Sequence, residues 1–166
     1  MTKLMLLIIF SLIIVSCTHY SFTGRSIPPG IRNAQLVLFE DSSGRYDLNL
    51  PDLLNDLMIH HIERHNYFRI ENSSGADSRI SGRIRSYNER FVSQTRDERT
   101  DQMAINITVE VSFFNNNTDE FVVRSLTVSE TEHYDSSGGD QIRDRAFETL
   151  MDRLAENIIL GLGSNW

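Results

Sequence analysis

The strongest constraint on the fold is the strict alternation of apolar and polar side chains from Met103 to Phe113. A β-strand places successive side chains on opposite faces, so this segment has one apolar face and one polar face. The apolar face carries Met103, Ile105, Ile107, Val109, Val111 and Phe113. A slip of one residue would expose all of these side chains, which fixes the register and predicts a sheet covered on one side only.

Two flanking segments have the composition of strands and are expected to pair with the alternating segment. Residues 77–87 and 120–132 lie on either side of it, and the second is rich in Val, Phe and Thr. In the first, one predicted face carries Ile80, Gly82 and Ile84, and the other carries Arg79, Ser81, Arg83, Arg85 and Tyr87. We expect 88–101 to form the mobile end of one hairpin and 115–119 to form the next turn, so the three strands are antiparallel.

Two segments have apolar side chains at the spacing of an amphipathic helix. The first covers about 51–65 and follows Asn49, a residue type favoured at helix starts. The second opens with a capping box at 137–140 and is expected to end at Gly161 and Gly163. Each helix therefore presents one apolar stripe to the core.

The remaining strand-like segment, 34–40, completes the predicted architecture because it is β-branched and aromatic enough to be buried. The element order is then β-α-β-β-β-α, and the first strand reaches the hairpins through a right-handed helical crossover. We predict that residues 31–166 form one domain of the α+β class. It is a two-layer sandwich in which two helices lie on one side of a four-stranded, largely antiparallel sheet.

The N-terminus carries an apolar run, residues 4–15, that is too short to span a membrane. Twelve helical residues reach about 18 Å, whereas the hydrocarbon core of a bilayer is about 30 Å thick. Lys3, the apolar run and the small residue Ser16 match the three regions of a secretory signal peptide. We therefore expect residues 1–16 to be a signal peptide that is removed.

The cysteine that follows this peptide is the predicted site of a lipid anchor. The run Ile14-Val15-Ser16-Cys17 resembles the lipobox of bacterial lipoproteins, in which the cysteine thiol is diacylated and the cysteine becomes the first residue. The alternative is an ordinary signal peptide with an incidental cysteine. Because two or three acyl chains make a stable anchor, we predict lipidation at Cys17 and a lipidated tether over 17–30.

The residues after the cysteine indicate a location. Thr18 stands where the enterobacterial sorting rule places Asp in proteins of the inner membrane, so the rule favours the outer membrane. Residues 18–24 lack the acidic tract that often follows the cysteine of surface-exported lipoproteins. We therefore expect a domain anchored by lipid to the outer membrane on its periplasmic side.

Composition excludes several functional classes. Without residues 1–16 the chain keeps 15 arginines, no lysine and 23 acidic residues, a net charge of -8, which argues against a nucleic-acid partner. One cysteine allows neither an internal disulfide nor a cysteine-based zinc cluster. The sequence contains neither a phosphate-binding glycine loop nor a Gly-x-Ser-x-Gly elbow, so we expect no enzyme activity and no cofactor.

Histidines are the best candidates for a metal site. His61 and His65 are one helical turn apart and His60 is adjacent. However, Glu63 follows His61 by two residues instead of the one found in zincins, and no third ligand is apparent. We expect these histidines at the margin of the core and no metal, with a metal site as the alternative. His133, at the end of a strand, is expected to solvate a loop instead of acting as an acid or base.

Arginine forms the most informative charged pattern in this acidic chain. Arg79, Arg83 and Arg85 project from one predicted strand face and have few acidic neighbours in sequence. The arginines within 90–99 are interleaved with acidic residues and are expected to pair locally. Guanidinium groups bind phosphates and carboxylates bidentately, so the strand row is a candidate contact for an anionic lipid headgroup or an acidic partner. The alternative is the solvated face of a half-covered sheet.

Motifs along nearly the whole mature chain follow a characteristic order and spacing. They are Cys17, Tyr-Ser-Phe-Thr-Gly at 20–24, Ser-Ile-Pro-Pro at 26–29, Ala76 and Asp77, residues 80–84, Tyr87, the strand 103–114 with its Asn-rich turn, residues 132–135, and Asn165 with Trp166. In this order they resemble the LptE family in its Bacteroidetes-like version. This family comprises the lipoproteins that partner the outer-membrane lipopolysaccharide-assembly barrel.

The resemblance implies the same two-helix, four-strand sandwich and a non-enzymatic role. Members of the family plug the lumen of a large β-barrel, assist its folding, and help deliver lipopolysaccharide to the outer leaflet. The implied partners are this barrel and lipopolysaccharide, with Arg79, Arg83 and Arg85 as our candidate contacts. Two alternatives remain open. One is a periplasm-facing adaptor or structural lipoprotein with another envelope partner, and the other is a metalloenzyme that uses the histidines of the first helix.

Overall fold

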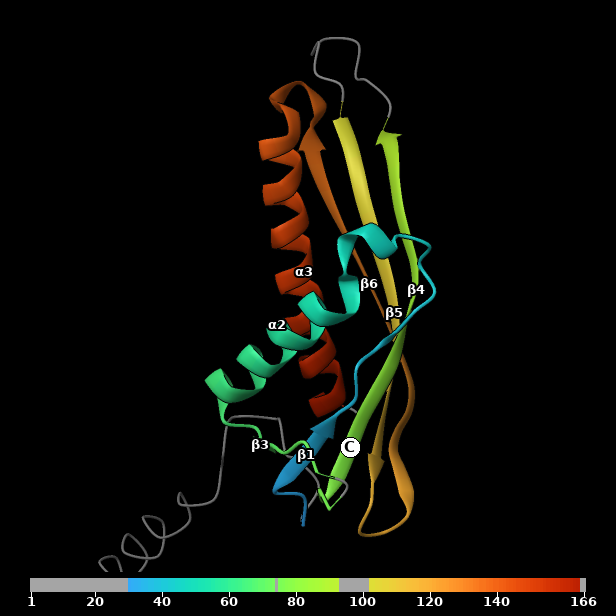
Figure 1. Ribbon diagram of the computed structural model, residues 1–166, viewed down its shortest axis with the longest axis vertical. Helices are drawn as coiled ribbons and strands as arrows, with labels where there is room; N and C mark the ends of the chain where they lie inside the picture. The colour runs from blue at the N-terminus through green and yellow to red at the C-terminus, as the bar shows by residue number, and fades with distance from the viewer. Residues whose placement is uncertain (1–29, 74, 93–101, 165–166) are drawn as a thin grey trace, which may run out of the picture.

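The computed structural model describes residues 30–164, with the exception of 74 and 93–101. The predicted signal peptide, Cys17 and the tether up to residue 29 lie outside the described residues, as do 165–166. The described part of the chain forms one sheet with two helices packed against one side of it (Figure 1).

Three long strands form the centre of the sheet: β4 (Ser78–Val92), β5 (Gln102–Asn115) and β6 (Glu120–Asp135). As the alternation predicts, β5 pairs antiparallel with both neighbours. Its inward-facing side chains are buried, with Met103 partly so: Met103, Ile105, Ile107, Val109, Val111 and Phe113. The predicted register of this segment is therefore confirmed, and so is the turn that follows it, at 116–119.

The sheet is mixed and has six strands, which corrects the predicted four-stranded, largely antiparallel arrangement. The additional elements are short, because the predicted strand 34–40 divides into β1 (Asn33–Leu36) and β2 (Glu40–Asp41), and β3 (Arg69–Ile70) is new. The order is β3-β1-β4-β5-β6, with β2 beside β4. Parallel pairing joins β1 to β3 and β4, and β2 to β4.

Tertiary contacts explain both differences. The strand 34–40 is interrupted because Phe39 turns into the core, where its ring lies so close to Gly82 that a Cβ there would overlap it. The new strand β3 forms because the chain returns beside β1, where the Arg69 N–H donates to the Arg32 carbonyl at 3.1 Å. Two-residue strands of this kind carry no periodic signal in the sequence.

The two helices, α2 (Leu50–His65) and α3 (Gly139–Ser164), lie on the same side of the sheet, as predicted (Figure 1). The first matches the predicted 51–65 and has Pro51 in its first turn. Leu54 and Met58 of α2 and Leu150 and Leu154 of α3 are fully buried in the core. Within the described ranges, no helix has both the length and the apolar content needed to cross a bilayer.

The start of α3 differs from the prediction. The residues interpreted as a capping box, 137–140, are instead divided between a 3-10 turn, η3 (Ser136–Gly138), and the first turn of the helix. Asp135 is the residue that caps this turn, because its Oδ1 accepts a hydrogen bond from the Ser137 N–H at 2.8 Å. The cap therefore lies just before the segment in which the pattern placed it.

The end of α3 also differs, because the helix continues through Gly161 and Gly163 to Ser164. A Cβ on Gly161 would lie 2.7 Å from Cδ2 of Leu126 in β6. This glycine therefore allows the helix to approach the sheet closely, and it does not terminate the helix as predicted.

A bulge in β4 changes which face its second half presents. The pairing with β5 shifts between Ile84 and Ser86, so Arg85 is an extra residue in the strand. Tyr87, predicted on the face of the arginines, is instead 7% exposed in the core. The strand also continues to Val92, so the first part of the predicted loop 88–101 is strand, and 93–101 lie outside the described residues.

Candidate binding surface on the open sheet face

The side of β4, β5 and β6 that faces away from the two helices is called here the open sheet face. Its centre is lined with hydroxyl and amide groups that bond to one another across the strands. Ser81 and Ser112 hydroxyls lie 3.1 Å apart, and those of Thr108 and Ser129 lie 3.0 Å apart. Nδ2 of Asn106 donates to the Ser129 hydroxyl at 3.1 Å. This face is therefore polar, and neither α2 nor α3 covers it.

The predicted arginines lie along one edge of this face, but two of them have carboxylate partners. Nε and Nη2 of Arg83 donate to the same oxygen of Glu40, at 2.8 and 2.6 Å. Arg85, at the bulge, pairs with Glu110 of β5. Neither partner is local in the sequence, because Glu40 and Glu110 lie 43 and 25 residues away from their arginines, so the neighbouring residues gave no sign of these pairs.

Glu110 is the central acidic group of this face. The Ser125 hydroxyl donates to its Oε1 at 2.7 Å, while Arg85 binds its other oxygen. These hydrogen bonds lower the pKa of Glu110. The bond from Ser125 has the largest effect and the bond from Arg85 the next largest. The carboxylate therefore stays ionised and neutralises the neighbouring guanidinium.

Arg79, the third predicted arginine, has a different environment. It has no ion pair with any carboxylate of the described residues, and its guanidinium lies over the ring of Phe114, 5.5 Å from the centroid. Phe114 packs edge-to-face on Phe121 with ring centroids 5.0 Å apart. Arg124 covers the far side of that pair, 4.7 Å from the Phe121 centroid. These four residues are called here the Arg-Phe cluster.

Sequence reasoning found one member of this cluster and missed three. Phe114 directly follows the alternating segment and lies at a polar-face position, opposite Arg79 in β4 and Phe121 in β6. The signal that was available is the Phe113-Phe114 pair, since two adjacent phenylalanines in a strand must face opposite sides of the sheet. Only the register brings Arg124 to the same place.

A shallow hollow of about 260 Å³ lies between the paired and unpaired arginines. Its lining includes Arg83, Glu110, Ser112 and Arg124. It is open and holds an arginine of each kind, so it can receive a polar or anionic group from a partner. The mixture of charges at this point suits contact with another surface better than acid-base chemistry.

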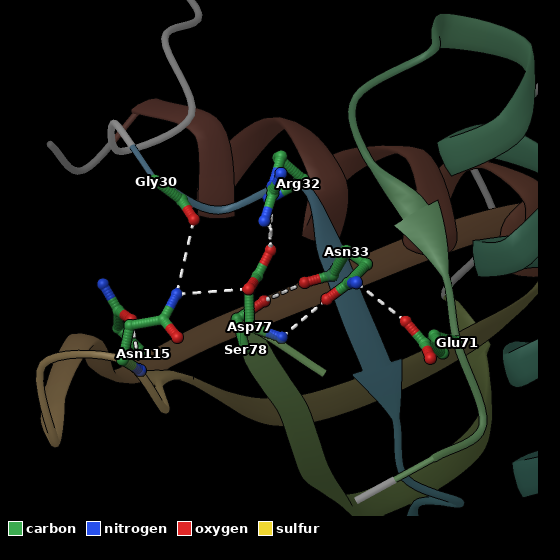
Figure 2. A network of polar contacts seen from close by, with 8 residues as sticks. Gly30, Arg32, Asn33, Glu71, Asp77, Ser78 and Asn115 are labelled. Atoms are coloured by element: carbon green, nitrogen blue, oxygen red, sulfur yellow. Dashed lines mark hydrogen bonds and ion pairs between the residues drawn. The ribbon is translucent and has the colours of Figure 1, made fainter. Parts of the chain in front are cut away.

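The point where the chain enters the sheet is held by a polar network centred on Asp77 (Figure 2). The Asp77 carboxylate accepts the Arg32 N–H at 2.9 Å and Nδ2 of Asn117 at 3.3 Å, and the same Nδ2 lies 3.3 Å from the Gly30 carbonyl oxygen. The Asp77 N–H donates to Oδ1 of Asn33 at 2.6 Å. The hydrogen bond from the Arg32 backbone is the main reason that the pKa of Asp77 is lowered. The network ties the incoming chain to the β5–β6 turn.

A second polar network closes the opposite end of the sandwich. Glu89 accepts hydrogen bonds from Nε of Arg143 at 2.9 Å, the Tyr134 hydroxyl at 2.6 Å and the Tyr87 hydroxyl at 3.1 Å. The bond from Arg143 is the main cause that lowers the pKa of Glu89 to about 2, and burial is the main cause that raises the pKa of Tyr134 to about 12. The network fastens α3 to the sheet.

The predicted metal candidates separate into different environments. His61 is 3% exposed, and its Nε2 lies 2.9 Å from Oδ1 of Asp152, so it joins α2 to α3. His65 stacks on it with ring centroids 6.4 Å apart, and His60 lies edge-on at 5.9 Å. In the part of the chain that the structure describes, no three His, Cys, Asp or Glu side chains are placed to share a metal ion. His133 is exposed on β6, as expected for a solvated position.

Comparison with protein families identifies a match over most of the chain. The sequence model of the LptE family, described as lipopolysaccharide-assembly, matches residues 32–160. This range includes β1 and nearly all of α3, so it covers both layers of the sandwich. A comparison with curated proteins finds no match.

Solved structures share the fold. The chain is similar to the uncharacterized lipoprotein B from Nitrosomonas europaea, with a TM-score of 0.58, 8% identity, and coverage of 81% of this chain and 83% of that chain. The minor lipoprotein from Acinetobacter baumannii has a TM-score of 0.52 and 14% identity, and the match covers 81% of this chain and 92% of that chain. The rare lipoprotein B from Shewanella oneidensis has a TM-score of 0.52 and 10% identity, and the match covers 78% of this chain and 94% of that chain. At these identities the similarity concerns the fold alone.

Proposed function

The chain belongs to the LptE family of lipopolysaccharide assembly, and from this premise we propose that it is a non-enzymatic outer-membrane lipoprotein that partners and plugs the lipopolysaccharide-assembly β-barrel. In this role it assists the delivery of lipopolysaccharide to the outer leaflet. The observation that carries the proposal is the family match over 32–160, which spans the sheet and both helices. The expected location is the periplasmic side of the outer membrane.

The open sheet face supports a role inside a barrel. The interior of an outer-membrane barrel is polar, and along each strand polar side chains that face the lumen alternate with apolar ones that face lipid. A polar sheet face whose hydroxyls and amides already bond across strands, such as Ser81 with Ser112, can exchange hydrogen bonds with such a wall. The helices supply rigidity behind it, since their apolar stripes are buried against the inner face of the sheet.

The anchor is part of the same proposal. Residues 1–16 act as the signal peptide, Cys17 carries the lipid, and 17–30 form the tether to a single domain, 31–166. The Asp77 network supports this arrangement because it holds the Arg32 backbone where the chain enters the sheet. A domain held at a defined point can be presented to a membrane partner in one orientation.

Arg79, Arg83 and Arg85 remain our candidate contacts with the barrel or with lipopolysaccharide. Arg83 and Arg85 offer paired charges, which a partner can recognise by exchanging hydrogen bonds with Glu40 and Glu110. Arg79 offers a guanidinium that makes no ion pair within the described ranges. The row therefore combines a neutralised section with a positive end.

A pull-down of the tagged lipoprotein from outer membranes, after mild detergent extraction, tests the proposed function. We expect a large β-barrel protein to be recovered in roughly equimolar amount. Recovery of a different envelope protein in its place would support the adaptor alternative. Recovery without any barrel protein would overturn the proposal.

The arginine contacts are tested by the triple variant Arg79→Gln, Arg83→Gln and Arg85→Gln in the same pull-down. We expect recovery of the barrel or of lipopolysaccharide to fall roughly tenfold, which corresponds to about 1.4 kcal/mol of binding free energy. The matched control is Arg64→Gln with Arg145→Gln, which removes exposed charges from α2 and α3. If the triple variant retains both partners at the level of the control, these arginines are not contacts.

A further inference from the structure

The Arg-Phe cluster has the properties of a membrane-contact surface, and we propose that it binds the phosphate headgroups of the anionic phospholipid leaflet to which the chain is anchored. The proposed function gives the domain a barrel partner and a lipid anchor. This inference adds a lipid-binding surface on the folded domain itself and a fixed orientation at the membrane. It rests on the proposed function only for the tether through Cys17.

The first argument is charge. Arg45, Arg83, Arg85, Arg143 and Arg153 each form an ion pair with a carboxylate. Arg79 and Arg124 form none with the carboxylates that the structure describes, and both are exposed. Other described arginines, such as Arg64 and Arg145, also lack an ion pair with a described carboxylate, but Arg79 and Arg124 lie against one aromatic pair on the open sheet face. A guanidinium binds a phosphate through two parallel hydrogen bonds, so these two arginines, one at each ring of a single aromatic pair, can each bind a phospholipid headgroup.

The second argument is the aromatic pair between these arginines. Phe121 is 43% exposed on a face that is otherwise polar, and Phe114 lies against it. Transfer of an exposed apolar ring from water to the boundary between headgroups and acyl chains is favourable. Arginines on either side can bury their aliphatic stems against the rings while their charged ends stay among the phosphates.

The third argument is position. The turn that joins the two phenylalanine strands contains Asn117, whose side chain lies against Gly30, the first described residue. Arg79 follows Asp77, which holds the Arg32 backbone, by two residues. The cluster and the incoming chain therefore share one end of the molecule, and Figure 1 shows this end, with β1 and the β5–β6 turn, opposite η3. We call it the tether end.

The length of the tether limits how far the tether end can lie from the membrane. Cys17 and Gly30 are 13 residues apart, so a fully extended tether spans at most about 45 Å. A lipidated Cys17 would keep the tether end within that distance of the leaflet. The cluster lies at this end of the described residues, so it is within reach of the leaflet.

The acidic residues near the cluster bear on whether Arg79 and Arg124 stay unpaired. Asp119 and Glu120 are exposed and precede Phe121 directly. Glu120 pairs in register with Asn115, whereas Phe121 pairs with Phe114, so the glutamate alternates to the opposite face. Asp77 is already engaged by Arg32 and Asn117. Neither Glu120 nor Asp77 therefore neutralises Arg79 or Arg124 on the open sheet face.

The test uses the full mature lipoprotein, acylated at Cys17, in vesicles of phosphatidylethanolamine and phosphatidylglycerol. Because the chain has one cysteine and that cysteine is acylated, Thr118→Cys places a single reactive thiol in the turn at the tether end. Asp140→Cys places one at the opposite end. A spin label on each thiol reports depth through its collisions with oxygen, which is enriched in lipid, and with a water-soluble nickel complex.

We expect the label at position 118 to lie at headgroup depth and the label at 140 to lie in water. Arg79→Gln with Arg124→Gln should lower the headgroup-bound population, roughly fivefold for each arginine lost. The control Arg64→Gln with Arg145→Gln should leave the depth unchanged. Phe121→Ser should also raise the label toward water, with circular dichroism showing that each variant is folded.

Three outcomes overturn the inference: the label at 118 is as water-exposed as that at 140, the arginine variant leaves its depth unchanged, or only vesicles that contain lipopolysaccharide draw it in. The last would make the cluster a lipopolysaccharide site. The barrel pull-down is independent of this measurement. Barrel recovery without a depth change disproves the membrane contact alone, and a depth change without barrel recovery disproves the proposed function alone.

Discussion

At the scale of single residues, Glu89 carries the clearest electrostatic consequence. Its carboxylate accepts hydrogen bonds from Arg143, Tyr134 and Tyr87, and its side chain is largely buried. These donors favour the charged form, so its pKa falls from 4.5 to about 2. One ionised side chain therefore joins β4, β6 and α3 at the end of the sandwich that lies away from the tether.

This pKa predicts acid sensitivity. The folded pKa lies below the unfolded value, so Glu89 stabilises the fold fully above pH 4.5 and loses this contribution as pH falls toward 2. The difference corresponds to about 3 kcal/mol of unfolding free energy. Glu89→Gln should therefore destabilise the protein by about 2 kcal/mol at pH 7 and flatten the pH dependence in that window. Urea unfolding at pH 7 and pH 3 measures both effects.

The exposed residue Glu148 on α3 provides the control, since Glu148→Gln removes the same charge from a helix surface. Its unfolding should follow that of the parent protein at both pH values. Equal acid sensitivity in Glu89→Gln and the parent would contradict the assigned role of Glu89.

Substitution of glycine by alanine is expected to have opposite effects on stability at two positions, Gly82 and Gly163. A Cβ on Gly82 would overlap the Phe39 ring and lie 2.6 Å from the Glu110 carbonyl oxygen, so Gly82→Ala should cost about 1 to 3 kcal/mol of stability. A Cβ on Gly163, in α3, meets no atom within 4 Å. Gly163→Ala should therefore stabilise the helix by up to about 1 kcal/mol. Thermal unfolding of both variants measures these effects, and a neutral Gly82→Ala would contradict the close approach of Phe39 and of the Glu110 carbonyl to this position.

At the scale of elements, the bulge in β4 determines which side chains reach the core. Arg85 is the extra residue, so Ile84 and Tyr87 both face inward although they are an odd number of positions apart. Without the bulge Tyr87 would point to solvent, and its hydroxyl would not reach Glu89. The bulge therefore connects the arginine face of β4 with the network at the other end of the same strand.

Deletions in β4 test this account. Removing Arg85 deletes the bulged residue and leaves the alternation on both sides intact, so the main loss should be the surface ion pair with Glu110, at most about 1 kcal/mol. Removing Asn88 instead moves Glu89 to the open face and breaks its bonds with Arg143. We expect the first variant to keep a cooperative urea transition and the second to lose several kcal/mol. Equal damage from both deletions would argue against a tolerated bulge.

At the scale of the whole molecule, the two polar networks give the sandwich distinct ends. The Asp77 network holds the incoming chain beside the β5–β6 turn, and the Glu89 network fastens α3 at the opposite end (Figures 1 and 2). The open sheet face runs between them, with the Arg-Phe cluster at the tether end. This polarity allows a lipid anchor, a membrane contact and a barrel contact to operate on one domain at the same time.

Asp77→Ala tests the polarity at the tether end. The Arg32 N–H donates to the Asp77 carboxylate at 2.9 Å, so losing that acceptor should raise hydrogen exchange at this amide by at least about tenfold. Exchange in the core of β5 should stay slow, because its backbone pairs with β4 and β6. Asp119→Ala in the adjacent turn is the matched control. Unchanged exchange at residues 32–34 would mean that the network does not hold the incoming chain.

Sequence alone determined the features that repeat along the chain. The register of β5, the helix predicted at about 51–65 and the apolar stripes that place both helices on one side follow from periods of two and 3.6 residues. The turn after β5 follows from its Asn-rich composition. These periods are set by covalent backbone geometry, so local pattern is sufficient to identify them. The family resemblance depended on motif order in the same way, and the match over 32–160 confirms it.

Contacts between residues far apart in the sequence depend on how the elements pack. The pairing of Arg83 with Glu40, the inward turn of Tyr87 and the joining of Arg79 to Phe121 and Arg124 depend on the bulge, on parallel strands two residues long, and on strand register. The same is true of Gly161, whose missing side chain makes room for Leu126 and does not end a helix. Such contacts are fixed by how whole elements pack, because each involves positions tens of residues apart that no local period relates.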